Sequence, residues 1–536
     1  MGRLHLYTAL CRFCSLALCI CLLFGCTRLN MSQEDLEIQM MEHSSASVLS
    51  TPAPQEQTDL CLPVSDEGIH SPFAYAGTTP SVVPLIYQSL FYLDDNYCPQ
   101  PQLAGTLTMG AENTSCTVTL RTGARFSDGS AVSAADVVAS LREALRYPQR
   151  FTMLAQTVSG CREENGAVVI TLQQPERNIA SLLTFPVCKA GTQSQDIPLG
   201  SGPFVYQTGS NLLEQNPYYP EDSLSIQKVE LIPVSDEESL GYMLKIGVID
   251  FYFSANATPD SYSHGSREYV TLNRLTYLGA NRQSGALLSN DSLWQLILDT
   301  IQKEQLVSYA CGNTASITNV PFHPGYWQHR TPNDLPQSSQ PESAPLSQSS
   351  SPSQPEQPLS IQQIMQQLGY SQQDAEGYWC NSYQGAMNRF TLRIVINTEN
   401  TVRHQLAQLL REQLGEIGIE TQIVSEAYAS YLQTIASRQF DLYIGEVQLD
   451  VNMDLSHLFT EENCAKLGFP YHADLLEAAR QLQGGQISDE AFLSLFFSYG
   501  TMEPLYYQRG TLCYTRNLTA DFIDGHRELF YRLEWY

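Results

Sequence analysis

The stretch from Leu103 to Leu145 restricts the fold of this 536-residue chain more than any other part of the sequence. Apolar and polar residues alternate from Cys116 to Leu120, which predicts a half-buried strand. The sequence Ser127-Asp128-Gly129-Ser130 predicts a turn, because glycine tolerates positive φ and aspartate bonds to nearby backbone. Ser133 is a predicted helix N-cap with Asp136 in the first turn, and apolar residues follow at helical spacing. A strand, a tight turn and a capped, core-facing helix therefore follow one another here.

This order of residues resembles the signature of the extracytoplasmic solute-binding proteins that serve peptide-type ABC importers. The resemblance continues in residues 84–93 (PLIYQSLFYL), which match a family helix, and in residues 198–204 (PLGSGPF), where glycines permit a tight turn. Members of that family bind oligopeptides, dipeptides, nickel chelates or some sugars. The resemblance implies an α/β, two-lobed periplasmic-binding-protein-like fold, in which mixed sheets with flanking helices form two lobes with a hinge between them.

The resemblance also divides the chain. The first lobe is expected at residues 59–280, with an accessory subdomain at about 85–200. The second lobe is expected at residues 281–473, and the chain is expected to return to the first lobe at residues 474–536. Residues 331–358, rich in Pro, Ser and Gln, are predicted to be a disordered insertion in the second lobe, with a domain boundary as the alternative. A single helix is expected over Asp291 to Leu306. Beyond the insertion, strands alternate with helices, which predicts parallel strands.

The first 26 residues have the pattern of a secretion signal. Arg3 and Arg12 are followed by an apolar run from Phe13 to Phe24, which is short for a membrane span and suits a signal peptide. The run ends in Leu-Phe-Gly-Cys, similar to the bacterial lipobox, so Cys26 is the predicted site of lipidation. Residues 27–58 are polar and predict a flexible tether to the cell membrane, outside the cytoplasm. An uncleaved N-terminal anchor is the alternative.

Charge and cysteine content exclude several classes of function. A formal net charge of −27 argues against binding nucleic acid or an anionic membrane face, since both require a basic surface. Nine cysteines follow Cys26 and none forms a C-x-x-C pair, so the sequence supports neither a metal site nor a cofactor. Most of the nine are expected to be buried apolar residues, with one or two unassigned disulfides.

The predicted ligand site lies after the strand Phe440 to Val447. Ligands of open α/β sheets bind at the carboxyl ends of strands, which places Glu446, Asp450 and Asp454 near a ligand. In peptide-binding relatives an aspartate after this strand pairs with the α-ammonium group of the peptide; by position that role falls to Asp450, with Asp454 as the competitor. The aromatic neighbours typical of those relatives are absent here, which favours a different amine as an alternative ligand. The two aspartates are equally consistent with a helix cap.

Two further residues complete the predicted site. Tyr75 is a candidate aromatic wall, or a core tyrosine. Asn281 follows Leu278-Gly279-Ala280, which resembles the family's crossing point between lobes, so it would contact the ligand or hold the hinge.

The function predicted from the sequence is a monomeric, lipid-anchored receptor that delivers a small polar ligand, in the first place a peptide, to an ABC permease. A sensor without transport, and capture of a metal chelate, sugar or other amine, are the alternatives. We do not expect an enzyme, because the sequence has no G-x-S-x-G or H-E-x-x-H motif.

Overall fold

The computed structural model of the chain describes residues 59–65, 71–74, 82–219, 226–255, 266–326, 359–383, 385–515 and 518. The predicted signal peptide with Cys26, the tether, Tyr75 and the insertion at 331–358 lie outside these residues. Within the described residues, helices are too short or too polar to cross a membrane. Each of the nine cysteines after Cys26 is described as a free thiol, and six are buried, so the expected disulfides are not formed among them.

The Leu103 to Leu145 stretch folds as its sequence predicts. Strand β5 (Ser115–Leu120) pairs with β4 (Ala104–Met109), and Gly129 N donates to Phe126 O at 2.9 Å in the following turn. Helix α4 (Ala134–Ala144) begins with a capping box in which Ser133 N donates to Asp136 Oδ2 at 2.9 Å. Together with β6 (Val158–Glu164) and β7 (Ala167–Leu172), the strands form an antiparallel sheet in the order β4-β5-β7-β6.

Asp136 also holds the next segment, because its second oxygen, Oδ1, accepts a hydrogen bond from Ala190 N at 2.7 Å. We therefore expect Asp136→Asn to lower the free energy of unfolding by about 1–3 kcal/mol, since the new amide presents a donor to backbone donors that lose their acceptor. Urea unfolding at neutral pH measures this loss. Glu163→Gln, on the exposed side of β6, is the control, and equal losses in the two variants would exclude this role for Asp136.

A second four-stranded sheet, in the order β1-β10-β9-β8, adjoins this part of the chain. Its members are β1 (Asp59–Ser65), β10 (Lys228–Val234), β9 (Leu212–Gln215) and β8 (Phe204–Gln207). The predicted helix over residues 84–93 is only one turn long, α3 (Val83–Ile86), and is followed by strand β2 (Phe91–Leu93), which pairs with β3 (Pro99–Pro101). Gly200 and Gly202 are required by close packing: a Cβ would lie 2.1 Å from Ile86 O at Gly200 and 2.4 Å from Ile86 C at Gly202.

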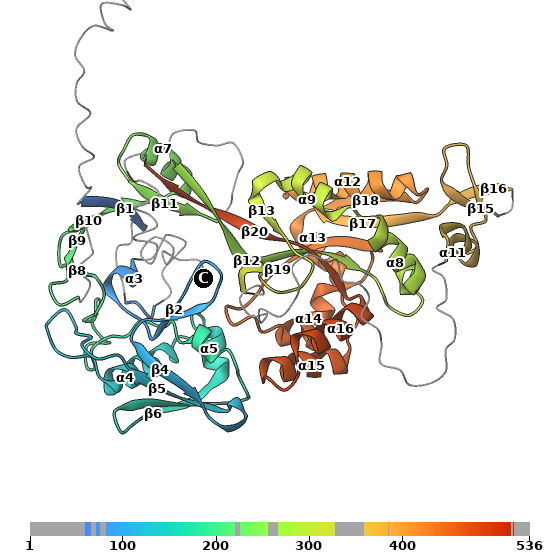
Figure 1. Cartoon of the computed structure of the whole chain (residues 1–536). Coiled ribbons are helices and arrows are strands. Elements are labelled where there is room, and N and C mark those ends of the chain that lie inside the picture. Colours follow the sequence, from blue (N-terminus) through green and yellow to red (C-terminus); the bar gives the residue numbers. More distant parts are fainter. Residues whose placement is uncertain are drawn as a thin grey trace, which may run out of the picture. The chain divides into compact units, whose positions relative to one another are not determined.

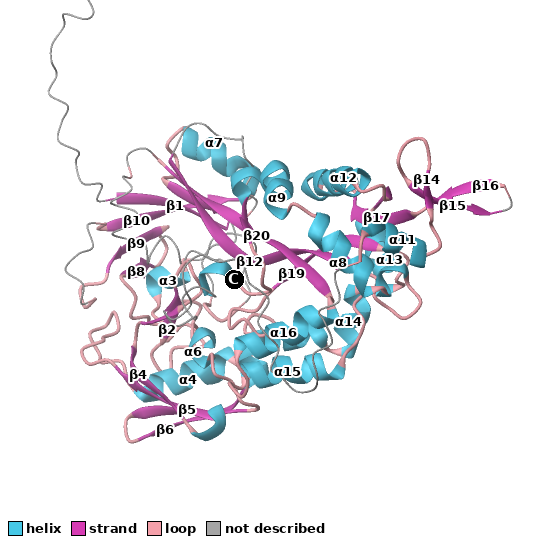
Figure 2. Ribbon diagram, turned by 45° about the vertical axis from the view of Figure 1, so that its right-hand side comes forward, coloured by secondary structure: helices cyan, strands magenta, loops and turns pink. Residues whose placement is uncertain are grey.

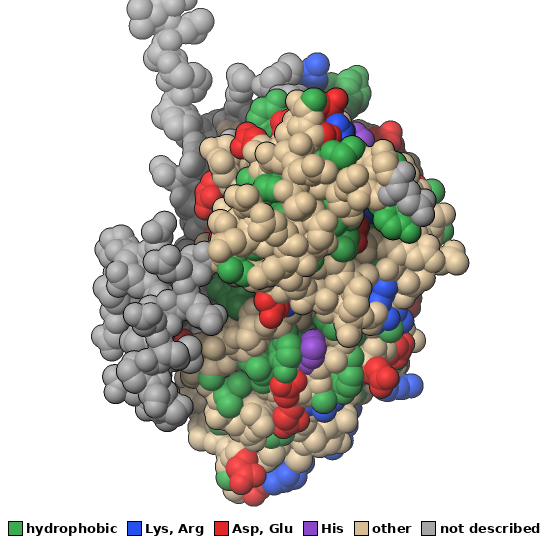
Figure 3. All heavy atoms as spheres, turned by 90° about the vertical axis from the view of Figure 1, so that its right-hand side faces the viewer, with side chains coloured by type: hydrophobic (Ala, Val, Ile, Leu, Met, Phe, Trp, Pro, Cys, Tyr) green, Lys and Arg blue, Asp and Glu red, His purple; other side chains and the backbone are tan. Residues whose placement is uncertain are grey.

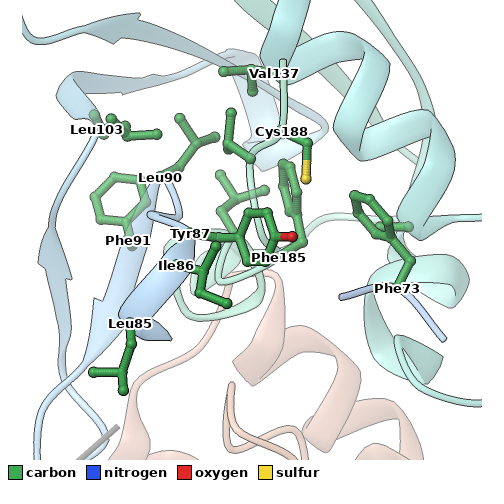
Figure 4. Close-up of a cluster of buried hydrophobic side chains, with 14 of the residues drawn as sticks. Phe73, Leu85, Ile86, Tyr87, Leu90, Phe91, Leu103, Val137, Phe185 and Cys188 are labelled. Atoms are coloured by element: carbon green, nitrogen blue, oxygen red, sulfur yellow. The ribbon is translucent and has the colours of Figure 1, made fainter. Parts of the chain in front are cut away.

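Buried side chains from these segments form one hydrophobic cluster, here called the first core. Figure 4 shows part of it, with Tyr87, Phe185 and Phe73 among the labelled side chains. Tyr87 is buried and its hydroxyl donates to Pro198 O at 3.0 Å, so the polar end of the ring is satisfied inside the cluster. Short helices α5 (Thr152–Thr157) and α6 (Ile179–Leu182) also contribute to the first core.

The largest sheet has seven strands in the order β11-β20-β12-β19-β17-β18, with β13 pairing on β20. They are β11 (Phe251–Ser254), β12 (Ser266–Ala280), β13 (Ala315–Ile317), β17 (Thr391–Asn397), β18 (Glu420–Glu426), β19 (Leu442–Gln448) and β20 (Met502–Tyr514). Strand β17 is parallel to both β18 and β19, as the alternation of strands and helices predicts, whereas β12 is antiparallel to β19.

Helices cover both faces of the β17–β18–β19 part of this sheet (Figure 2). One face packs against α8 (Asp291–Thr300), α9 (Lys303–Cys311), α11 (Ile361–Gln367) and α12 (Thr401–Glu416). The other packs against α13 (Tyr428–Ala436), α14 (Glu461–Leu467), α15 (Ala473–Gln483) and α16 (Asp489–Tyr499). We call these two clusters together the second core. The helix expected over Asp291 to Leu306 is interrupted, because Ile301 has an extended backbone between α8 and α9.

Two smaller elements lie at the ends of the large sheet. Helix α7 (Leu240–Lys245) packs beside β11. A hairpin-like sheet of β14 (Gln372–Gln373), β15 (Trp379–Tyr383) and β16 (Ala386–Arg389) extends from the second core (Figure 1). Arg389 secures it by ion pairs to Asp374, Glu376 and Glu420, with nitrogen–oxygen distances of 2.5, 2.6 and 2.9 Å.

Strands β12 and β20 belong to both cores and run side by side between them (Figure 1). In β12, Val270 is buried in the first core and Leu275 in the second, and the pairing register with β20 shifts between Thr271 and Leu275. The chain thus changes core a few residues before the expected crossing at Leu278 to Asn281.

The return to the first core also differs from the expectation. Helices α15 and α16 bury their apolar faces in the second core, and only the last part of β20, with Leu512 and Tyr514, reaches the first. The packing places the return within β20 rather than at residue 474, because the apolar faces of α15 and α16 find their partners in the second core. The other domain boundaries stay predictions.

Candidate ligand-binding site

Asp450 lies in the loop after β19, at the carboxyl end of a strand that is parallel to its neighbour β17. Its carboxylate is 30% exposed, and its Oδ2 lies 3.1 Å from Nδ1 of His457. Burial raises the pKa of Asp450 above its usual value, His457 lowers it by a smaller amount, and the charge of Asp454 raises it. Asp450 is therefore a partly desolvated carboxylate that a cationic group can reach.

Asp454 has a different role. It is 4% exposed, and its Oδ1 accepts a hydrogen bond from Ser456 N at 2.8 Å, at the start of the 3₁₀ helix η5 (Ser456–Phe459). The N-cap residue of η5 is Leu455 and η5 has no side-chain cap, so Asp454 stabilises the turn before η5 and neither aspartate caps this helix. Asp450 retains its role as a predicted ligand contact.

The structure does not bring Glu446 and Asn281 to the same place as Asp450. Glu446 pairs with Arg403 of α12 at 3.4 Å. Asn281 Nδ2 donates to Arg438 O and Phe440 O, both at 3.2 Å, and so ties the end of β12 to the segment before β19. Of the two roles considered for Asn281, the structure describes the structural one.

The loop after β19 is contacted directly by polar residues just before α6, a helix of the first core, which the sequence did not indicate. Asn178, just before α6, donates from Nδ2 to Asn452 O at 3.0 Å, and Asn452 Nδ2 donates to Glu176 Oε2 at 2.9 Å. These partners are separated by 274 and 276 residues. The one available signal is that Glu176 to Asn178 is a polar segment shortly after β7, a strand that contributes to the first core.

A cavity of about 270 Å³ lies near the point where β12 changes core. Its lining residues are Asp95, Asn96, Glu268, Tyr269, Val270, Thr271, His323 and Gly325. His323 is buried with Nε2 3.2 Å from Thr271 O, and burial lowers its pKa to about 4, so the ring is neutral at pH 7.

Asn273 links the segment that carries the cavity residues Asp95 and Asn96 to the Asp450 loop. Its backbone N donates to the Tyr97 hydroxyl at 3.1 Å, and its Nδ2 donates to Leu449 O at 2.6 Å. Thr271, just before the register shift of β12, therefore lines a cavity whose wall also contains Asp95 and Glu268. Asn273, within the shift, contacts the Asp450 loop. Such an arrangement suits a polar ligand with a cationic group, because carboxylates in a partly buried setting favour a positive partner.

On the face shown in Figure 3, Asp and Glu side chains are spread among hydrophobic and basic ones. Such a distribution fits a role of the net charge in solubility.

Comparison with known sequences gives a family match. The profile of the bacterial extracellular solute-binding proteins, family 5 Middle, matches residues 99–462. The glutathione-binding protein GsiB of Escherichia coli K12 is 22% identical over 362 residues, which is 64% of this chain and 64% of that protein. The match therefore spans less than two thirds of the length of this relative.

Solved structures are similar over most of the chain. The periplasmic murein-tripeptide-binding protein MppA, in an unliganded open form, has a TM-score of 0.65 at 16% identity and covers 90% of this chain and 97% of its own. NikA from Brucella suis, in complex with Fe(III)-EDTA, has a TM-score of 0.60 at 14% identity, covering 86% and 96%. A nickel ABC transporter protein from Bacillus halodurans has a TM-score of 0.63 at 15% identity, and the match covers 88% of this chain and 98% of that protein. These likenesses confirm the predicted two-lobed, mixed α/β fold.

Proposed function

Because the chain belongs to the bacterial extracellular solute-binding proteins of family 5, we propose that it captures a small polar solute between its two lobes and delivers it to an ABC import permease. A peptide is the first candidate, since the names of two similar proteins refer to glutathione and a murein tripeptide. The observation that carries the proposal is the position of Asp450: a half-buried carboxylate at the carboxyl end of β19, in a loop that residues of the first core also contact.

The physical basis is charge pairing in a closed site. An ammonium group withdrawn from water needs a charged partner, and Asp450 supplies one. A ligand that contacts both lobes only when they are close together favours the closed arrangement. The shared strands β12 and β20 would serve as the connection about which the lobes move.

The proposal includes the cellular location of the receptor. The apolar run and the lipobox-like sequence before Cys26 support a signal peptide and lipid attachment, with the folded part outside the cytoplasm. The family name, bacterial extracellular, agrees with that location.

Thermal unfolding of the purified chain with separate pools of peptides, sugars and nickel chelates tests the proposal. A ligand at a hundred times its Kd stabilises the folded state by roughly 2.7 kcal/mol, so we expect the peptide pool to raise the Tm by several degrees. A shift with the sugar pool alone or the nickel pool alone would contradict the peptide assignment. No shift with any pool, each component at millimolar concentration, would contradict solute capture.

A further inference from the structure

A polar contact surface joins the two cores, and we call it the seam. Its residues on the first-core side are Asn113, Glu176, Arg177 and Asn178, and on the second-core side Asn452, Gln483, Gly484 and Asp489. Backbone groups take part as well: Arg177 N donates to Gln483 O at 2.9 Å. Separation of the two cores at this point would break all of these hydrogen bonds.

Glu176 lies at the centre of the seam and is 3% exposed. Gln483 Nε2 lies 2.8 Å from each of its carboxylate oxygens, Asn452 Nδ2 lies 2.9 Å from Oε2, and Asn178 N lies 2.6 Å from Oε1. All of these donors are neutral. Hydrogen bonds from neutral donors alone therefore stabilise this buried carboxylate. Buried charges are usually paired with an opposite charge or bound to a metal.

The charged groups around Glu176 do not supply a cation to it. Asp454, in the same loop as Asn452, disfavours its negative charge. Arg177 is engaged by Asp489 of α16, at 2.9 Å. Tyr326, which accepts a hydrogen bond from Asn178, is buried and neutral because burial raises the pKa of its hydroxyl well above its usual range.

Asn452 provides a place for a proton on Glu176. Its side chain is fully buried, and its Oδ1 has no hydrogen-bond partner although its Nδ2 bonds to Glu176. A carboxylic acid is a donor as well as an acceptor. Rotation of the Asn452 amide by half a turn would bring Oδ1 to Glu176 Oε2, where it would accept the hydrogen bond from the acid, while Nδ2 would take the position that Oδ1 leaves.

We propose that Glu176 is a proton-binding site of the seam, so that the closed contact between the two cores takes up a proton that the open state releases. The atoms balance simply: solvent supplies one proton to Glu176 Oε2 as the seam forms, and Asn452 Oδ1 accepts the resulting O–H. The proposal goes beyond solute capture and does not depend on the identity of the ligand.

The direction of the pH dependence follows from burial. Burial raises the pKa of Glu176 to about 7 from the usual 4.5, although hydrogen bonds from Gln483, Asn178 and Asn452 lower it. Because the closed state holds the proton more tightly, closure is most favourable below pH 4.5 and weakens as the pH rises through about 7. Because the pKa rises from 4.5 to about 7, the ratio of closed to open molecules can change with pH by at most ~300-fold.

Hydrogen exchange of the Arg177 amide tests the proposal directly, because this N–H bonds across the seam. The protection factor, which corrects for the intrinsic pH dependence of exchange, is measured from pH 5 to pH 8 on the full chain without ligand. We expect protection in the wild type to fall at least tenfold over this range. In Glu176→Gln, a neutral side chain that can donate to Asn452 Oδ1, protection should stay high and independent of pH.

Asn113→Gly is the matched control, since it removes the neutral hydrogen bond from Asn113 Nδ2 to Gly484 O across the seam, at 2.9 Å, and changes no charge near Glu176. In this variant the protection factor of the Arg177 amide should be lower than in the wild type by the same factor at every pH, so that its slope against pH is unchanged. A flat wild-type profile overturns the proposal, as does an equal slope in Glu176→Gln. If the glutamine variant does not fold, the wild-type profile and the Asn113→Gly profile decide: a parallel fall supports the proton site, and a flat pair refutes it.

Discussion

Replacing Gly445 by alanine is expected to lower the free energy of unfolding by about 3 kcal/mol, at the upper end of the usual cost of overpacking. Gly445 of β19 lies opposite Tyr277 of β12, and a Cβ would come within 2.4 Å of the Tyr277 ring. Tyr277 cannot move away, because its ring packs edge-on against Tyr443, 5.8 Å between centroids, and against Phe469 at 5.6 Å. The tyrosine hydroxyls also lie 3.2 Å apart.

A suitable control is Gly160→Ala in β6. A Cβ there meets no atom within 4 Å, and Gly160 has no positive φ. Urea unfolding should show a loss for Gly445→Ala and little or no loss for Gly160→Ala. If both variants are as stable as the wild type, the close packing of Tyr277 over Gly445 does not hold in solution.

The second large effect concerns the ligand. Asp450→Asn should weaken binding of a peptide found in the thermal-shift screen by ~2–5 kcal/mol, or about 30-fold to several thousand-fold, because the ammonium group loses its charged partner. Asp299→Asn, on the exposed face of α8, changes the net charge equally and is the control. Calorimetric titration of both variants measures the difference.

A pH series in the Glu176→Gln variant, whose closure is expected not to change with pH, adds an independent check on Asp450. Its pKa is raised mainly by burial, and binding requires its ionised form. Affinity should therefore fall as the pH is lowered through this raised pKa, and the decline should begin at a higher pH than for an exposed aspartate. Equal affinity for the wild type and Asp450→Asn would remove Asp450 from the site and leave the fold unchanged.

Local signals explain what the sequence could predict. Ser133, Asp136 and the Asp128-Gly129 turn act within a few residues of one another, so their structure follows from capping and turn chemistry. The alternation from Cys116 to Leu120 likewise lies within strand β5, Ser115–Leu120. The family resemblance, confirmed by the profile match, extended the prediction to the two-lobed fold.

Long-range packing explains the differences. The helix expected at residues 84–93 stops after Ile86, where the backbone of Gly200 and Gly202 approaches it. The sequence around Ile301 contains no proline or glycine that would predict the interruption between α8 and α9.

The candidate site shows the same limit. The position of Asp450 followed from the end of a parallel strand, a local signal. Glu446 was assigned to the same loop end, but its side chain lies on the face that packs against α12, where Arg403 pairs with it. The contact of Glu176 with Asn452 links residues 276 apart, which no local pattern reports.

Amide exchange along the whole chain, with and without the peptide found in the screen, tests most directly whether a solute binds between the two lobes. Added protection is expected both in the second-core loop from Leu449 to Asp454 and in the first-core segment from Glu176 to Asn178. Protection confined to one core, or absent from both at saturating peptide, would contradict capture between the lobes.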